Sequence, residues 1–224
     1  MNFNILRSQE EQIQAIATQL ESLVSKFLKE KDQVVIAVSG GKSPIKLFER
    51  LSNTDLPWDK ILITLVDERV VDTENEDSNE NLVKTHLLKN YAKKAKFVGL
   101  VDIIKSVTDM LQLANTNIPN IDIAILGMGE DGHTASIFPC CQELDDAINL
   151  DNKNKYINTN PLFVKYSRIS LTLPALFSIP SLILSINSEI KFKVFNESLK
   201  ANNKSYPISY LLNLRNDLIT FYYE

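Results

Sequence analysis

Short apolar runs rich in β-branched residues alternate along this chain with stretches of helical hydrophobic spacing, and this alternation constrains the fold most strongly. Runs at 34–38, 61–66 and 121–126 are almost wholly apolar, which is typical of strands buried on both faces of a sheet. Strands separated by helices favour a parallel sheet. The sequence therefore predicts an α/β fold: a doubly wound, mainly parallel sheet with helices on both faces.

Five segments are expected to form the covering helices. The first begins with a capping box at Ser8 and runs to Phe27. The second takes Ser43 as its N-cap and Pro44 as its first helical residue. The remaining helices are expected over 78–88, from Asp102 to about 113, and over 189–200.

The last third of the chain is expected to be β-rich, and no feature divides the chain into separate domains. A short strand is expected near 97–98, and four more at 155–158, 168–173, 181–186 and 219–223. We find no internal repeat, low-complexity tract or Pro/Gly/Ser linker. The 224 residues suit one α/β domain, so residues 1–224 are expected to form a single domain.

Composition argues against several classes of function. The formal net charge of −4 and the pI near 5.4 argue against a nucleic-acid or membrane-surface partner. No apolar stretch reaches the ~18 residues of a membrane span, and Met1 to Glu11 lacks the apolar core of a secretion signal. The adjacent Cys140 and Cys141 suit a reducing cytoplasm, and two histidines exclude a His-rich metal centre.

Glycine placement predicts where a ligand binds. Five of the six glycines lie in two loops, at 40–41 and 127–132, and each loop directly follows a predicted strand. Glycine lets the backbone turn tightly and approach a ligand closely. Ligands of doubly wound sheets bind outside the carboxyl ends of the strands. We therefore expect both loops to line one pocket, the alternative being two ordinary tight turns.

Neither loop fits a nucleotide-binding motif. Gly41-Lys42-Ser43 imitates the end of a Walker A loop, but position 36, where that motif needs a glycine, is isoleucine. The second loop matches G-x-G-x-x-G literally, yet Pro139 ends the following segment after barely two turns, whereas a dinucleotide fold needs a long helix there. No nucleotide cofactor is expected.

The second glycine loop contains the candidate catalytic residues. His133 lies at a predicted strand end, where an imidazole can accept a proton near neutral pH. Asp131, two residues earlier, could orient that imidazole or tune its basicity; the alternative is a surface histidine in a turn. His86 lies within a predicted helix beside leucines, where a packing role is expected.

Arg69 is the candidate anion-binding residue. It follows a buried strand and the acidic pair Asp67-Glu68. The planar guanidinium suits a phosphate or a carboxylate ligand. An ion pair with one of the two neighbouring carboxylates is the alternative, and both interpretations can hold together.

These motifs, taken together, resemble the 6-phosphogluconolactonase family. The matching segments are Ser39-Gly40-Gly41, Val66–Arg69, Ser78-Asn79, Leu126–Pro139 and Arg168–Pro174. Their order and spacing fit over nearly the whole chain, and the run from Leu126 to Pro139 is the most specific. The resemblance implies hydrolysis of 6-phosphoglucono-1,5-lactone to 6-phosphogluconate in the oxidative pentose phosphate pathway, without a metal or nucleotide cofactor.

The resemblance also implies residue roles. His133, with Asp131, would deprotonate the water that attacks C1, and backbone N–H groups of one glycine loop would stabilise the oxyanion. Arg69 would hold the 6-phosphate, and Arg168 is a second phosphate candidate. The residues expected to bind substrate are Gly40, Gly41, Lys42, Asp67, Arg69, Gly129, Lys165 and Arg168.

Three positions depart from the family pattern. The family usually has Ser or Thr after Ser-Gly-Gly, where this chain has Lys42, which either adds charge for the phosphate or faces solvent. Lys165-Tyr166-Ser167 replaces a Lys-Pro-Pro stretch, which leaves Lys165 one or two residues out of place. Cys140 replaces the usual glycine after Phe-Pro.

Two functions on the same fold are alternatives. Glucosamine-6-phosphate deaminases have a loop of similar form, but their downstream glutamate has no equivalent between Ser136 and Pro139. Sugar-phosphate-sensing regulators carry a DNA-binding helix-turn-helix ahead of the sensor, whereas one amphipathic helix precedes the first strand here. We expect a cytoplasmic enzyme that acts on a small sugar-phosphate substrate. It is expected to be a monomer or weak dimer, with no nucleic-acid or membrane partner.

Overall fold

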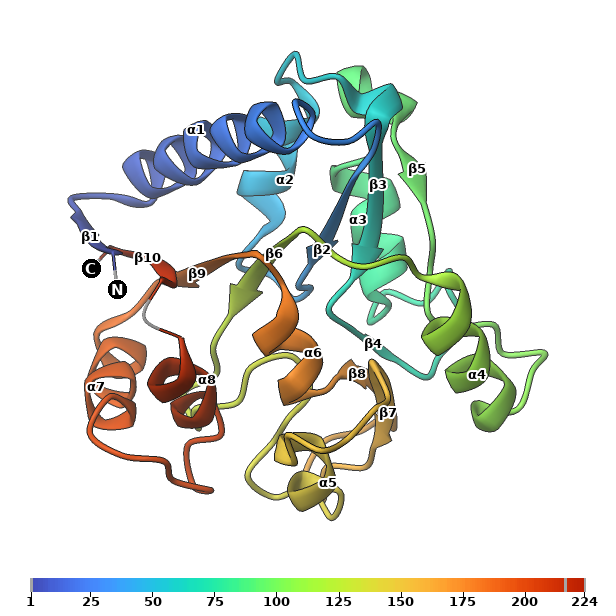
Figure 1. The fold of residues 1–224 in the computed structure, drawn as a ribbon, viewed down its shortest axis with the longest axis vertical. Helices are drawn as coiled ribbons and strands as arrows, with labels where there is room; N and C mark the ends of the chain where they lie inside the picture. The colour runs from blue at the N-terminus through green and yellow to red at the C-terminus, as the bar shows by residue number, and fades with distance from the viewer. Residues whose placement is uncertain (1, 216, 224) are drawn as a thin grey trace.

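A seven-stranded parallel sheet forms the centre of the computed structural model, which describes residues 2–215 and 217–223 (Figure 1). Its strands are β1 (Asn2–Leu6), β2 (Val34–Val38), β3 (Ile61–Leu65), β5 (Lys96–Phe97), β6 (Ile123–Gly127), β9 (Ser181–Ile186) and β10 (Ile219–Tyr223). Their order is β1-β10-β9-β6-β2-β3-β5. All neighbours pair in parallel, which confirms the predicted α/β class.

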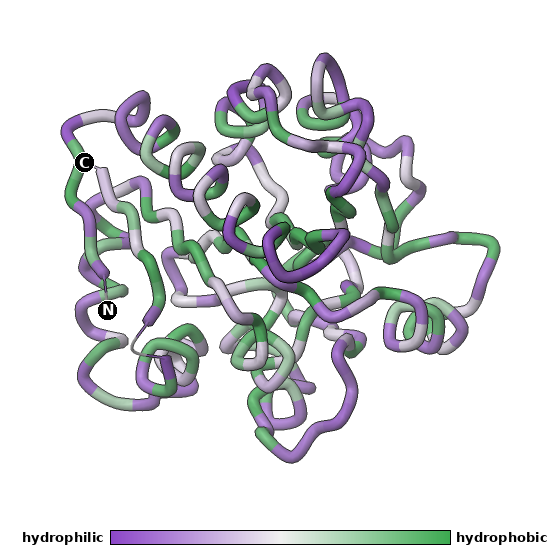
Figure 2. The backbone as a smooth tube through the Cα atoms, turned by 45° about the horizontal axis from the view of Figure 1, so that its top comes forward, coloured by the Kyte–Doolittle hydropathy of each residue, from purple (hydrophilic) through white to green (hydrophobic). Residues whose placement is uncertain are grey.

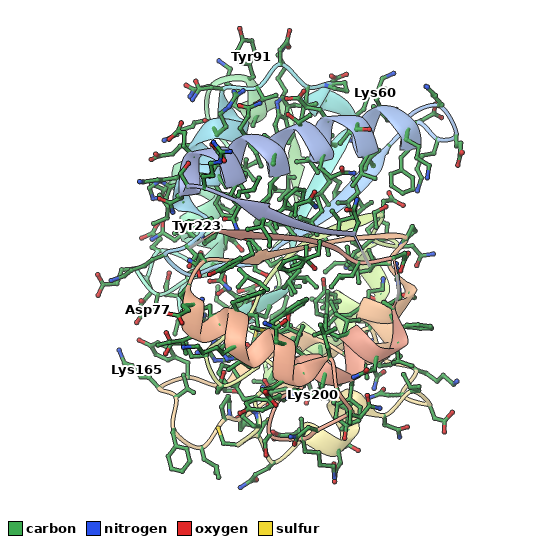
Figure 3. All side chains as sticks on the ribbon, turned by 90° about the vertical axis from the view of Figure 1, so that its left-hand side faces the viewer. Lys60, Asp77, Tyr91, Lys165, Lys200 and Tyr223 are labelled. Carbon is green, nitrogen blue, oxygen red and sulfur yellow. The ribbon has the colours of Figure 1, made fainter. Side chains whose placement is uncertain are left out.

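Helices cover both faces of this sheet. They are α1 (Gln9–Phe27), α2 (Ile45–Ser52), α3 (Asn79–His86), α4 (Val107–Asn117), α5 (Leu144–Ile148), α6 (Leu173–Ser178), α7 (Glu189–Ser198) and α8 (Ile208–Leu214). Figure 3 shows α1 above the strands and α7 below them. Every residue of β2 and β3 is buried, and hydrophobic segments follow the interior strands in Figure 2. None of the helices in the described residues combines the length and apolar character needed to cross a bilayer.

A second, three-stranded antiparallel sheet lies beyond the carboxyl end of β3. It consists of β4 (Asp67–Arg69), β8 (Arg168–Leu171) and β7 (Tyr156–Thr159), in the order β4-β8-β7. Arg69 is paired with Arg168, which on its other side is paired with Thr159. Residues directly opposite in such sheets point to the same face, so this row carries two arginines side by side.

Three predicted helix starts are right, among them Glu189 for α7, and two are wrong. The side chains of Ser8 and Ser78 cap α1 and α3 as expected. Ser43 does not cap α2, because its hydroxyl accepts a hydrogen bond from Asn187 instead and the helix begins after Pro44. The helix predicted from Asp102 begins at Val107.

Local side-chain hydrogen bonds explain the later start of α4. Ser106 accepts a hydrogen bond from the backbone of Asp109 and is the N-cap. Asp102 bonds to the backbone N–H of Ile104 and pairs with Lys105 in a turn. Serine and aspartate side chains both accept hydrogen bonds from backbone amides a few residues later, whether at a helix N-cap or in a turn. The sequence alone therefore did not show whether Asp102 or Ser106 caps α4.

Candidate active site

The two glycine loops line one cavity at the carboxyl ends of β2 and β6. The cavity has a volume of about 250 Å³. Gly40 and Gly41 contribute one wall, and Gly127 and Gly129 contribute another. Among the described residues, the amides of Gly40 and Gly41 donate no hydrogen bond, and Gly41 adopts a φ of +85°. Free amide donors in such a loop suit an anion or a developing oxyanion.

His133 and Asp131 form a close pair at this cavity. Nδ1 of His133 lies 2.5 Å from Oδ1 of Asp131, and His133 lines the cavity. Burial raises the pKa of Asp131, but the hydrogen bond and charge of His133 outweigh that effect and leave the pKa lowered. The ionised carboxylate therefore holds Nδ1–H, which leaves Nε2 as the nitrogen that can take a proton.

The pair has this geometry because residue 129 has no side chain. A Cβ at Gly129 would overlap the imidazole of His133 and the carboxylate of Asp131. The tight turn is closed by hydrogen bonds from the amide of Gly129 to the His133 carbonyl at 2.9 Å and from the amide of Gly132 to the Gly129 carbonyl at 3.1 Å. The ring of Phe138 stacks on His133 with centroids 4.1 Å apart. The geometry of the His133–Asp131 pair thus requires glycine at position 129, independently of any ligand contact.

We expect Gly129→Ala to lower kcat at least ~100-fold, because a displaced catalytic group costs about that much for each ångström of error. The thermal midpoint of unfolding should change far less. Measuring kcat and this midpoint together distinguishes a misplaced side chain from an unfolded protein. Gly99→Ala is the matched control, because its added Cβ would overlap the carboxylate end of the Glu80 side chain and touch the ring of Phe97, away from the cavity. Equal kcat values for the two variants would contradict this account.

A buried charged cluster faces His133 from the small sheet. Oδ2 of Asp67 lies 2.5 Å from Oγ of Ser136 and 3.8 Å from Nη1 of Arg168. Arg168 also lies over the ring of Phe138, at 5.2 Å. Burial lowers the pKa of Arg168, and the charge of Asp67 opposes that shift. Asp67 and Arg168 thus form a buried ion pair beside the cavity.

Arg69 is the second guanidinium of this cluster and lies opposite Arg168 in the small sheet. Its Nη1 donates to the carbonyl of Asp77 at 2.5 Å. Within the described residues, the Nε atoms of Arg69 and Arg168 are buried without a hydrogen-bond partner. Like charges directly opposite in a sheet are destabilising, and buried donors are normally satisfied. Both features suit an anion bound between the two guanidinium groups.

Lys191 is a cavity residue that the sequence analysis missed. It lies in the first turn of α7, just after β9, and it lines the cavity together with Asn187. Burial lowers its pKa, and the charge of Glu130 opposes this. Ser188 is the N-cap of α7, so the signal was a lysine three residues after a cap, at the carboxyl end of a predicted strand.

Two predicted substrate-binding lysines lie outside the cavity lining. Lys42 is exposed, and the lining does not include it. Lys165 is also exposed and lies near Asp77 at the surface, with its Nζ 3.8 Å from the carboxylate (Figure 3). The lining provides no support for substrate binding by either lysine. The half-buried His86 contacts Glu49 of α2, in keeping with a packing role.

Glu68 anchors α3 beside the cavity. Its carboxylate is buried and accepts hydrogen bonds from the amides of Arg69, Asn79 and Glu80 and from the hydroxyl of Ser78. Burial raises the pKa of Glu68, and these four donors oppose that shift. A buried carboxylate at a helix N-terminus fixes α3 against β4.

We expect Glu68→Gln to lower the free energy of unfolding by about 2 kcal/mol or more, because an amide NH₂ would face backbone donors in place of a charged acceptor. Urea unfolding should show a lower midpoint with an unchanged slope. Glu49→Gln, at an exposed position, should leave the midpoint nearly unchanged. Equal midpoints for wild type and Glu68→Gln would show that the four bonds are not formed.

No group of three or more His, Cys, Asp or Glu side chains in the described ranges is arranged to hold a metal ion. The cavity instead offers an imidazole with an oriented tautomer, two open amide donors and three cationic side chains. This set can activate water, stabilise an oxyanion and bind an anionic substituent.

The fold and this site place the chain in the family of glucosamine-6-phosphate isomerases/6-phosphogluconolactonases, whose pattern matches residues 7–220. The chain is 38% identical over 208 residues to the 6-phosphogluconolactonase of Neisseria meningitidis serogroup A, covering 91% of this chain and 90% of that protein. It is 40% identical to the Helicobacter pylori 6-phosphogluconolactonase, covering 89% and 87%. The crystal structure of a Shewanella baltica 6-phosphogluconolactonase matches with a TM-score of 0.94 at 32% identity, covering 100% and 98%.

Proposed function

We propose that this protein hydrolyses 6-phospho-D-glucono-1,5-lactone to 6-phosphogluconate in the oxidative pentose phosphate pathway. The chain shares its family, fold and most of its length with proteins named 6-phosphogluconolactonase, which are hydrolases that act on a lactone. The observation that carries the proposal is the Asp131–His133 pair, 2.5 Å apart, at a cavity rich in cationic side chains.

In the proposed reaction, Nε2 of His133 takes a proton from water as the water oxygen attacks C1 of the lactone. The amides of Gly40 and Gly41 stabilise the negative charge that develops on the carbonyl oxygen. The tetrahedral intermediate then collapses as the bond from C1 to the ring oxygen breaks, and the imidazolium returns its proton to that oxygen. Asp131 stabilises the imidazolium while it exists.

The 6-phosphate is bound, in this proposal, by the cationic side chains of the cavity. Arg69 is the primary phosphate residue and Arg168 the second. Lys191, which also lines the cavity, adds a third positive charge. Charge-assisted hydrogen bonds from guanidinium groups to phosphate are among the strong ones, and the two unpaired Nε donors supply them. Asp67 keeps Arg168 in position.

The cellular setting is also proposed. Cys140 and Cys141 are both free thiols, as suits a reducing cytoplasm. We propose that residues 1–224 act there as a single domain, as a monomer or weak dimer, on a small-molecule substrate alone.

Two parallel assays test the proposed function. With freshly prepared 6-phosphogluconolactone, acid should form faster than in the enzyme-free control. With glucosamine 6-phosphate, no ammonia should be released above background. The opposite pattern would assign the chain to the isomerase branch of its family.

A further inference from the structure

Asn79 joins the first glycine loop to the strand that carries Asp67 and Arg69. Its side chain is 1% exposed and packs flat against Gly40, where a Cβ would overlap its amide group. Its Nδ2 donates to the carbonyl of Asp67 at 2.7 Å. The backbone N–H of Asn79 donates to Oε1 of Glu68 at 2.8 Å. One buried residue thus contacts both the first glycine loop and β4.

The contact between Asn79 and Gly40 helps to fix the direction of the free amide donors of Gly40 and Gly41. Gly41 has a positive φ, and a Cβ there would meet nothing within 4 Å, so its Cα faces open space. At the start of the loop, the amide of Ser39 donates to the carbonyl of Ile125, and Asn79 packs on Gly40 directly after it. Preorganised donors are effective only when their direction is fixed before the charge develops.

We propose that Asn79 is a positioning residue for the Gly40–Gly41 donor pair. The proposal rests on the proposed function, because it assumes that these amides face the reacting carbonyl. Asn79 acts through Gly40 on one side and Asp67 on the other, and takes no proton itself.

The test is a double-mutant cycle of Asn79→Ala and Gly40→Ala, read by kcat/KM and by thermal midpoint. Asn79→Ala should lower kcat/KM about 10- to 100-fold, measured well below its midpoint. Asn115→Ala is the matched control, since Asn115 makes two hydrogen bonds that join α4 to Tyr156 and one within α4, away from the cavity. It should lower the midpoint at least as much and leave kcat/KM within about twofold.

The Gly40→Ala change should lower the midpoint in the wild-type background and much less in the Asn79→Ala background, because its methyl group fills the vacated space. Additive midpoint shifts, or an Asn79→Ala enzyme within twofold of wild type, would overturn the proposal. An inactive wild-type protein would refute the proposed function instead. The midpoint cycle would then still decide whether Asn79 and Gly40 are coupled.

Discussion

Replacing His133 by asparagine should lower kcat for lactone hydrolysis by about 10²–10⁴-fold, the usual contribution of a general base. Asparagine keeps a hydrogen-bonding side chain of similar size but cannot accept the proton of the attacking water. The fold should survive, because the side chain is partly exposed, at 29%. Initial rates on fresh 6-phosphogluconolactone, minus the spontaneous rate, provide the measurement.

Two further variants make this result specific. His86→Asn should retain near-normal kcat, because His86 contacts Glu49 outside the cavity. Asp131→Asn should lower kcat less than His133→Asn does, since it removes the orienting charge and leaves the base. A folded His133→Asn enzyme with kcat within about threefold of wild type would refute the assignment, and a carboxylate such as Asp67 would then be the candidate base.

Arg69→Ala should lower kcat/KM for the phosphorylated lactone at least ~10-fold, because a charge-assisted pair in a partly dry pocket contributes about 1.5–3 kcal/mol. The same variant should change the hydrolysis of unphosphorylated gluconolactone much less. The ratio of the two kcat/KM values is the measurement, since any general damage to the site cancels in it.

The other cationic residues of the cavity provide the comparison. Lys191→Ala should shift the same ratio in the same direction, by less than Arg69→Ala. Arg168→Ala should also reduce stability, because it leaves Asp67 buried without its ion-pair partner. If Arg69→Ala lowers kcat/KM equally for both substrates, Arg69 does not bind the phosphate. It would then hold the shape of the loop that contains Asp67 and Glu68.

The interior strands were predictable because their sequences leave little choice. Strands such as β2 and β3 are short, apolar and rich in β-branched residues, and the structure buries them fully. β4 was not predictable in the same way, since Asp67-Glu68-Arg69 has no strand preference. It forms because β8 pairs with it and Glu68 accepts hydrogen bonds from the first two amides of α3. Tertiary contacts overrode local preference there.

The candidate site was predictable where several signals coincided within a few residues. His133, Asp131 and Gly129 share one loop after one predicted strand, and their chemistry follows from that loop alone. Lys191 depends on α7 packing beside a distant glycine loop, which local spacing does not reveal. The support that Asn79 gives to Gly40 likewise depends on two segments meeting in space.

Proton release from freshly prepared 6-phosphogluconolactone, followed by titration at constant pH, measures directly whether this protein hydrolyses the lactone. Each ring opening yields a carboxylic acid that ionises near neutral pH and releases one proton. The rate should rise in proportion to protein concentration, and with His133→Asn the enzymatic part of it should fall by about 10²–10⁴-fold. A rate equal to the protein-free control at every concentration of folded wild-type protein would contradict it.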